Sequence, residues 1–338
     1  MEIAAYVGGE ASIPGVDRVL RLASNENPLG PSPRAMEAYR ELADELHRYP
    51  DGGATALRES IAEVYGLDAS RIVCGAGSDE LISLLTRAYA GPGDEVLYSR
   101  HGFLMYPISA KGVGARPVAV AERNLCADVD ALLEAVNEHT RILFLANPNN
   151  PTGSYLPASE VERLQAGLPE SVLLVIDAAY AEYVEAADYE AGVRLVENCE
   201  NVVMTRTFSK IHGLAALRLG WAYCSPAVAD VLNRLRGPFN VSALAAGVAA
   251  IRDQDYVAQC RDSNRKARAA FVEGLKRLNL RAEPSEGNFV LVRFSDAAAA
   301  AEHLKKQGVL VRRMDSYGLA QHLRITIGSE ADMGRVLT

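Results

Sequence analysis

The stretch that decides the fold is Asn201-Val202-Val203-Met204-Thr205-Arg206-Thr207-Phe208-Ser209-Lys210. Its first half is a mostly apolar run, which predicts a buried strand. Two hydroxyls and an amine follow that run, and Arg218 comes eight residues after the lysine. An amine can condense with an aldehyde, while hydroxyls and a guanidinium can hold a phosphate. The stretch therefore predicts a site for a ligand that carries both groups.

Short apolar runs alternate with helical patterns on both sides of this stretch. The runs expected to be strands are 71–74, 95–98, 141–145, 172–176, 201–204 and 219–223. Helical patterns lie between them, at roughly 79–90, 104–111, 128–138, 157–166 and 226–236. Several runs are apolar throughout, as in a sheet that helices cover on both faces. The pattern predicts a doubly wound, mainly parallel α/β sheet, with ligands bound beyond the carboxyl ends of its strands.

The pattern changes after about residue 240. A charged helical stretch at 242–279 precedes apolar runs at 288–294, 309–312 and 323–327, and this order predicts a smaller α+β domain. The start of the chain is rich in Gly and Pro and shows little periodicity. We therefore expect an N-terminal arm (1–25) that packs on the small domain, a large α/β domain (26–240) and a small C-terminal domain (241–338).

The composition argues against several classes of protein. The 338 residues are 49% hydrophobic and 23% charged, which is ordinary for a globular protein with a real core. A net charge of -8 without a basic stripe argues against nucleic-acid binding. No apolar run has the length of a membrane span, and the chain lacks the apolar core of a signal peptide. The five cysteines are scattered and free of CxxC pairs, which indicates a cytoplasmic protein without a disulfide frame or a metal site.

A glycine-rich turn, Gly75-Ala76-Gly77-Ser78-Asp79-Glu80, lies between an expected strand and an expected helix. Glycines let the backbone turn tightly, and the free N–H groups of a helix start attract an anion. A plain structural turn with capping residues explains this motif equally well on its own. It is not the GxGxxG pattern of nicotinamide-binding proteins. Together with Thr207, Ser209 and Arg218, the turn predicts a cup for a phosphate.

Other polar and aromatic residues follow the remaining strands. Asn150, in Asn147-Pro148-Asn149-Asn150-Pro151-Thr152-Gly153, could donate its amide to a ring oxygen, although such loops are often simple turns. Asp177 ends a strand, with Tyr180 three residues later, and a lone acid there could instead cap a helix. Phe103 could stack on a ring or belong to the core. An amine, a phosphate cup and a carboxylate that keeps a pyridine nitrogen protonated together predict a site for pyridoxal 5'-phosphate (PLP).

The chain resembles the fold type I PLP-dependent aminotransferases, and more closely the histidinol-phosphate aminotransferase family. The stretches that carry the resemblance are 22–30 (LASNENPLG), 48–51 (RYPD), 77–80 (GSDE), 149–153 (NNPTG), 207–210 (TFSK), 217–220 (LRLG) and 323–328 (LRITIG). They span nearly the whole chain in the order of the family. The resemblance implies the fold type I architecture, the cofactor PLP and a homodimer with shared active sites.

The resemblance also implies roles for residues around the cofactor. Lys210 would bond to the aldehyde and move protons during the reaction. Asp177 would pair with the pyridine nitrogen, and Asn150 with Tyr180 would hold the phenolic oxygen. Phe103 would stack on the ring. The residues that would bind the phosphate are Ser78, Asp79, Thr207, Ser209 and Arg218.

Further residues would complete the site from a second chain and from the small domain. Tyr49 would cross the dimer interface to the phosphate of the neighbour's cofactor. Arg324 would hold the acidic group of the substrate, which is the α-carboxylate of glutamate or the phosphate of histidinol phosphate. Arg312, Tyr6 and Asn150 would be further contacts to the substrate.

Two positions depart from the family's pattern. Ala178 stands where an acidic residue usually follows the aspartate. Because Asp177 and Tyr180 keep their spacing, we expect Ala178 to change only the surroundings of the site. His212 occupies a place that often holds an aromatic residue, and we expect it to pack beside the site.

The expected activity is transfer of an amino group between glutamate and imidazole acetol phosphate, a step of histidine biosynthesis. An aromatic aminotransferase, acting on phenylpyruvate, hydroxyphenylpyruvate or prephenate, would carry almost the same motifs and remains an alternative. A threonine-phosphate decarboxylase on the same fold is a second alternative. A non-catalytic PLP-binding regulator is a third, which we do not favour because the resemblance begins early and we expect no DNA-binding module ahead of it.

Overall fold

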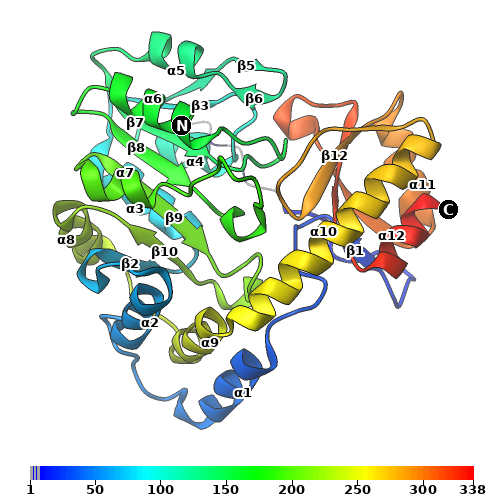
Figure 1. The fold of residues 1–338 in the computed structure, drawn as a ribbon, viewed down its shortest axis with the longest axis horizontal. Coiled ribbons are helices and arrows are strands. Elements are labelled where there is room, and N and C mark those ends of the chain that lie inside the picture. Colours follow the sequence, from blue (N-terminus) through cyan, green and yellow to red (C-terminus); the bar gives the residue numbers. More distant parts are fainter. Residues whose placement is uncertain (1–2, 4, 6–7) are drawn as a thin grey trace.

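The computed structural model describes residues 3, 5 and 8–338, and its largest feature is a seven-stranded sheet (Figure 1). The strand order is β2-β10-β9-β8-β7-β3-β4. These strands are β2 (Ile72–Gly75), β3 (Glu95–Ser99), β4 (Arg116–Val120), β7 (Thr140–Ala146), β8 (Leu173–Asp177), β9 (Val202–Thr207) and β10 (Gly220–Tyr223). Strand β10 runs antiparallel to β2 and β9, and the other neighbouring pairs are parallel. The predicted doubly wound, mainly parallel sheet is confirmed, whereas β4 was not expected.

Hydrophobic cores cover both faces of this sheet. Leu143 of β7 and its partner Leu174 of β8 lie in one core. The next pair, Phe144 and Val175, lies in the other core. Successive side chains of a strand point to opposite faces, so apolar side chains are buried on both faces of these strands. This arrangement explains why the strands appear in the sequence as continuous apolar runs.

Helices surround the large sheet in the order that a doubly wound fold requires. Those that follow its strands are α3 (Ser78–Tyr89), α4 (Met105–Gly112), α5 (Val129–Ala135), α6 (Ala158–Gly167), α7 (Val193–Asn198) and α8 (Pro226–Leu235). A short hairpin, β5 (Glu122–Arg123) and β6 (Cys126–Ala127), precedes α5. Helices α1 (Pro33–Glu41) and α2 (Thr55–Tyr65), which were not predicted, pack against α9 (Val241–Arg252) at the foot of Figure 1.

A second sheet of five strands lies beside the long helix α10 (Gln254–Arg277), on the side away from the large sheet (Figure 1). The strands, in the order β1-β13-β14-β12-β11, are β1 (Leu20–Leu22), β13 (Val309–Arg313), β14 (His322–Thr326), β12 (Phe289–Arg293) and β11 (Arg281–Ala282). Only the β1–β13 pair is parallel among the pairs of this sheet. Helices α11 (Ala297–Lys306) and α12 (Glu330–Leu337) complete this part of the chain. Strand β1 falls in the segment that was expected to be an irregular arm.

The helical stretch expected at 242–279 is interrupted at Asp253, where α9 ends and α10 begins. Ala246 and Ile251 of α9 lie in a core of the large sheet, whereas Phe271 of α10 lies in the core of the small sheet. The division into an arm, a large domain and a small domain stays a prediction. This packing favours a boundary near Asp253 over the one expected at residue 240.

The described residues also bear on membranes, metals and disulfides. In residues 3, 5 and 8–338, every helix is too short or too polar to cross a membrane. The same part of the chain has no group of His, Cys, Asp and Glu that could hold a metal ion. All five cysteines are free thiols.

Candidate active site

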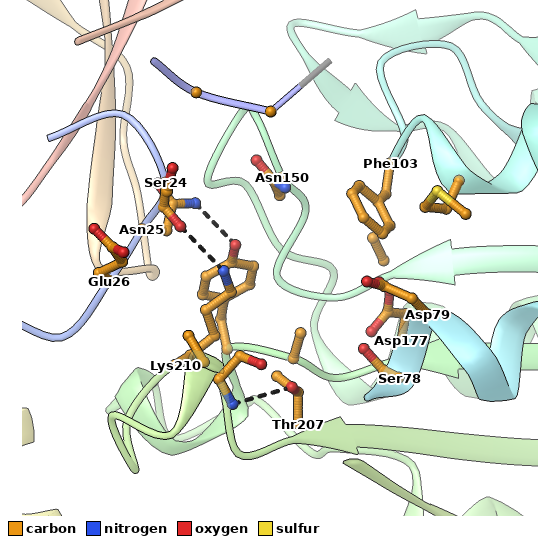
Figure 2. A pocket seen from close by; sticks show the side chains of 18 of the residues that line it. Ser24, Asn25, Glu26, Ser78, Asp79, Phe103, Asn150, Asp177, Thr207 and Lys210 are labelled. Carbon is orange, nitrogen blue, oxygen red and sulfur yellow. Dashed lines mark hydrogen bonds between the residues drawn. The ribbon is translucent and has the colours of Figure 1, made fainter. Parts of the chain in front are cut away.

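A cavity of about 270 Å³ lies at the carboxyl edge of the large sheet. Its walls come from the ends of β7, β8 and β9, the start of α3, and strands β13 and β14 of the small sheet. The segment 23–26, just after β1, forms another wall (Figure 2). The predicted site residues that line this cavity are Ser78, Asp79, Phe103, Asn150, Asp177, Tyr180, Thr207, Ser209, Lys210, Arg218, Arg312 and Arg324.

One wall gathers hydroxyls and a guanidinium around the start of α3. Ser78 and Asp79 are the first residues of that helix, and no side chain caps it. Arg218 donates from Nη2 to Asp79 Oδ2 (3.0 Å) and from Nη1 to Ser209 Oγ (3.3 Å). The backbone N–H of Ser209 donates to Thr207 Oγ1 (3.1 Å). We call these five residues the anion cup, because helix N–H groups, hydroxyls and a guanidinium suit a phosphate.

Two glycines give the anion cup its room. Gly77 has a φ of +90°, and a Cβ atom there would lie 2.6 Å from Arg218 Nη2. A Cβ atom at Gly220 would lie 2.5 Å from the backbone nitrogen of Ser78. Gly77 belongs to the turn that sequence analysis singled out. The requirement at Gly220 arises from the pairing of β10 with β2, which the sequence did not indicate.

Asp177, the last residue of β8, is a buried carboxylate in the cavity wall. The hydroxyl of Tyr106 donates to its Oδ2 (2.8 Å), and the hydroxyl of Thr205 donates to its Oδ1 (3.4 Å). Burial raises the pKa of Asp177 to about 6, and these hydroxyls offset that rise only in part. A positive charge placed beside this carboxylate would stabilise its ionised form. The position therefore suits a protonated ring nitrogen.

Lys210 lies just beyond the end of β9, and its side chain enters the cavity (Figure 2). Its Nζ donates to the carbonyl oxygen of Ser24 (3.3 Å) and lies 5.7 Å from the centre of the Tyr180 ring. The hydroxyl of Tyr180 accepts a hydrogen bond from Asn25 Nδ2 (2.8 Å). Burial raises the pKa of Tyr180 to about 12, although the charge of Arg324 and the bond from Asn25 oppose the rise. The phenol therefore keeps its proton at neutral pH.

The small sheet contributes two cations to the cavity wall, Arg312 from β13 and Arg324 from β14. Arg324 is buried and donates to the carbonyl oxygen of Ala23 (2.7 Å) and to Asn150 Oδ1. A guanidinium can only donate, so it binds the amide oxygen of Asn150 and leaves the amide nitrogen for another acceptor. Two guanidiniums in one wall suit an acidic group of a ligand.

Phe103 combines a place in the cavity wall with a packing role. Its ring meets the ring of Tyr106 edge-on, with centroids 5.9 Å apart. Tyr106 in turn stacks on Phe144 of the core, with centroids 4.6 Å apart. Phe103 is thus anchored on the core through Tyr106 while it lines the cavity.

The two positions that depart from the family's pattern lie outside the cavity wall. Ala178 is fully buried in a core of the large sheet. His212 is buried too, with its ring centroid 4.9 Å from that of Phe208, and burial lowers its pKa to about 4. Its Nε2 lies 4.0 Å from Glu182 Oε1, and Glu182 is paired with the buried guanidinium of Arg206 (2.9 Å). These contacts support the expected packing role of His212.

One predicted site residue, Tyr49, is not part of the cavity wall in this chain. Tyr49 is 95% exposed and lines a separate hollow with Leu46, Pro50 and Phe239. Leu46 is also largely exposed, so this surface offers apolar area that a second chain could cover. Tyr6 lies outside the described residues, and its predicted contact with the substrate stays a prediction.

Sequence analysis missed several residues of the site. Ser24, Asn25 and Glu26 line the cavity, but their stretch was quoted only for its resemblance to a family. The sequence signal that could have identified them is the run of polar residues Ser24-Asn25-Glu26-Asn27 shortly after the apolar Leu20–Leu22. Tyr106 was missed because an aromatic residue one turn after Phe103 looks like an ordinary core residue.

Comparison with known proteins agrees with this geometry. The family model described as "Aminotransferase class I and II" matches residues 17–338. A histidinol-phosphate aminotransferase of Rhodospirillum centenum is 60% identical over 342 residues, covering 99% of this chain and 94% of that protein. One of Paramagnetospirillum magneticum is 60% identical over 336 residues, covering 97% and 93%. The crystal structure of histidinol-phosphate aminotransferase from Sinorhizobium meliloti in complex with pyridoxal-5'-phosphate aligns with a TM-score of 0.89 at 30% identity, covering 94% of this chain and 89% of that one. The chain therefore belongs to the class I and II aminotransferases, and within them to the histidinol-phosphate aminotransferase family.

Proposed function

We propose that the protein is a PLP-dependent aminotransferase that moves the amino group between L-glutamate and imidazole acetol phosphate, with 2-oxoglutarate and L-histidinol phosphate as the products. One observation carries the proposal: a single cavity joins the amine of Lys210, the buried carboxylate of Asp177, the anion cup and the guanidiniums of Arg312 and Arg324. The similarity to proteins named histidinol-phosphate aminotransferase, over almost the whole chain, supports the choice of substrate.

The residues of the cavity fit PLP by their chemistry. The anion cup would bind the phosphate through helix N–H groups, hydroxyls and a guanidinium. Asp177 would face the protonated pyridine nitrogen, which supplies the positive charge that its buried carboxylate needs. Asn150, through its amide nitrogen, and Tyr180, through its hydroxyl, would hold the phenolic oxygen. Phe103 would lie against the ring.

When bound, PLP supplies an aldehyde that condenses with amines and a ring that accepts the electron pair left when a Cα–H bond breaks. Lys210 would hold the aldehyde in the resting enzyme. After glutamate takes its place, Lys210 Nζ would remove the proton from the substrate Cα. The contact of Nζ with the carbonyl oxygen of Ser24 (3.3 Å) keeps the amine inside the cavity for this task.

The substrate would be bound by the guanidiniums of the small sheet. Arg324 is fixed in direction by its bonds to the carbonyl of Ala23 and the amide of Asn150, so its guanidinium loses little freedom when an acidic group binds. It would pair with the α-carboxylate of glutamate in one half-reaction and with the phosphate of histidinol phosphate in the other. Arg312, in the same wall, would be a further contact to either group.

The active site would be completed by a second chain. Tyr49, 95% exposed in this chain, would reach the anion cup of its neighbour in a homodimer. Its exposed ring and the exposed side chain of Leu46 support an interface at this surface. A cytoplasmic location stays a prediction, supported by the five free thiols.

The half-reactions test this proposal directly. The PLP-loaded enzyme is converted with L-glutamate, freed of 2-oxoglutarate by gel filtration, and mixed with single oxo compounds. We expect imidazole acetol phosphate to restore the visible absorbance of the aldehyde form fastest. Faster recovery with phenylpyruvate, hydroxyphenylpyruvate or prephenate would instead indicate an aromatic aminotransferase. Release of carbon dioxide from threonine phosphate without an amino acceptor would indicate a decarboxylase, and a coloured protein inert to glutamate would indicate a regulator.

The role of Lys210 has its own test. In Lys210→Ala, the visible band that depends on the bond between this amine and the aldehyde should be absent, and turnover with it. An enzyme that keeps both the band and the turnover would contradict the assignment. Lys276→Ala is a matched control, because Lys276 is an exposed lysine of α10 that pairs with Glu273 (3.3 Å) and is not part of the cavity lining.

A further inference from the structure

Asn25 is a buried residue of the cavity wall that the proposed mechanism does not use. It is 1% exposed and has a φ of +55°, a left-handed conformation that asparagine adopts more readily than most residues. Its backbone N–H donates to Thr326 Oγ1 (2.9 Å), and its carbonyl oxygen accepts from Asn288 Nδ2 (2.9 Å). Asn25 is therefore fixed on the small sheet, since Thr326 ends β14 and Asn288 directly precedes β12.

The side-chain amide of Asn25 has a defined orientation. Its Oδ1 accepts from the hydroxyl of Thr326 (3.2 Å), and its Nδ2 donates to the hydroxyl oxygen of Tyr180 (2.8 Å; Figure 2). Thr326 Oγ1 accepts the backbone N–H of Asn25 and donates its own proton to the amide oxygen, so both of its roles are used within this segment. The amide nitrogen is then the end that meets Tyr180.

This bond restricts the proton of Tyr180. A phenol hydroxyl has one proton to donate, and its oxygen can accept as well. Because Asn25 donates to that oxygen, the proton of Tyr180 cannot point at the amide of Asn25. Tyr180 lines the cavity together with Lys210 and Asn150, so its proton is directed toward a ligand in that space.

We propose that Asn25 is a positioning residue, which directs the hydroxyl proton of Tyr180 toward the phenolic oxygen of bound PLP. The inference rests on the proposed function, because it requires PLP in this cavity. A phenolic oxygen that accepts this proton carries less negative charge, and it stabilises a proton on the nearby nitrogen of Lys210 less strongly. Asn25 therefore lowers the pH at which the PLP-loaded enzyme changes colour in the absence of substrate.

Two substitutions at position 25 remove the side-chain amide donor and keep the left-handed backbone conformation. Asn25→Asp keeps the shape and tolerates the positive φ, but a carboxylate accepts from Tyr180 and draws the proton away from the ligand. Asn25→Gly keeps the conformation and removes the side chain. The visible absorbance of the PLP-loaded enzyme is measured as a function of pH, and the midpoint is the pH at which half of the colour change has occurred. We expect Asn25→Asp to raise the midpoint by about one pH unit, a tenfold change in proton affinity, and Asn25→Gly to raise it by less.

Tyr180→Phe shows whether the effect passes through the hydroxyl. In that background, Asn25→Gly should leave the midpoint where Tyr180→Phe alone sets it. Asn25→Asp should shift the midpoint by less than it does when Tyr180 is present, because only the charge of the carboxylate still acts. Asn27→Ala is the matched control, since Asn27 lies in the same segment but donates to Ile211 O (2.7 Å) and Cys260 Sγ (3.2 Å). It should lower the thermal stability and keep the wild-type midpoint.

The outcomes are distinguishable. An unmoved midpoint in Asn25→Asp, or an equal shift in the Tyr180→Phe background, would overturn the inference and leave the proposed function intact. If Asn25→Asp does not fold, the same two criteria apply to Asn25→Gly. A wild-type protein that forms no visible band with PLP would overturn the proposed function, and this inference with it.

Discussion

The buried carboxyl of Asp177 should make the stability of the PLP-free protein depend on pH. Burial raises its pKa from 3.8 to about 6 in the folded chain. The folded state therefore binds this proton more tightly than the unfolded state. The resulting stabilisation is fully present below about pH 4 and is lost as the pH rises through about 6. Two pKa units correspond to about 3 kcal/mol.

Asp177→Asn removes the titrating group and keeps its shape. Tyr106 can still donate to the amide oxygen at position 177, because that bond needs only an acceptor. We expect the free energy of unfolding of the variant, relative to that of the wild type, to rise by about 3 kcal/mol between pH 4 and pH 8. The same substitution should weaken PLP binding, since an amide does not stabilise a protonated pyridine nitrogen as a carboxylate does.

Urea unfolding of the PLP-free proteins, followed by circular dichroism at several pH values, measures this difference. Asp230→Asn is the control, because Asp230 is an exposed residue of α8 that pairs with Arg234 (2.9 Å). It leaves Asp177 in place and should keep the wild-type dependence on pH. If the difference in the free energy of unfolding between Asp177→Asn and the wild type stays constant from pH 4 to pH 8, the reasoning is refuted.

Three other substitutions test the anion cup, the dimer and the core. Gly77→Ala should displace Arg218, whose Nη2 would lie 2.6 Å from the new Cβ, and weaken PLP binding about 10- to 100-fold in equilibrium dialysis. Tyr49→Ala chains mixed with Lys210→Ala chains should regain activity above the mean of the two parents, because a mixed dimer contains one complete site. Glu182→Gln should lower the free energy of unfolding by about 3–5 kcal/mol in urea, because it removes one charge of a buried ion pair.

Two of these predictions have a matched control variant, and the mixed chains are compared with their two parents. Gly91→Ala should keep the wild-type affinity for PLP, because nothing lies within 4 Å of a Cβ atom there. Asp230→Asn breaks an exposed pair and should cost about 1 kcal/mol or less. An unchanged affinity in Gly77→Ala, mixed chains no more active than their parents, or a Glu182→Gln variant as stable as Asp230→Asn would contradict the respective prediction.

The predictable part of the site consists of residues that directly follow strands. Asp177, Asn150 and Lys210 each come at or just after the end of a strand of one parallel sheet, and such ends meet at one edge. Asn25 could not be placed in the same way, because its position depends on how the small sheet lies against the large one. The bond from Tyr106 to Asp177 likewise depends on the packing of α4, which a periodic pattern does not specify.

The missed elements of the fold have physical reasons as well. Strand β4 contains Pro117, which argues against a strand unless that strand lies at the edge of a sheet, as β4 does. Strand β1 has only the residues Leu20–Leu22, too few for an alternating pattern. The break between α9 and α10 at Asp253 has no Gly or Pro beside it, so the stretch resembled one long helix.

The pairing of β1 with β13 has a consequence for folding during synthesis on the ribosome. Leu20 lies opposite Val309, so almost the whole chain forms the loop between them. Closing a loop of this length costs about 5 kcal/mol of chain entropy. On the ribosome, Leu20–Leu22 emerges long before its partner strand has been translated. We expect this segment to stay open to proteases in stalled nascent chains until residues beyond Arg313 have left the exit tunnel.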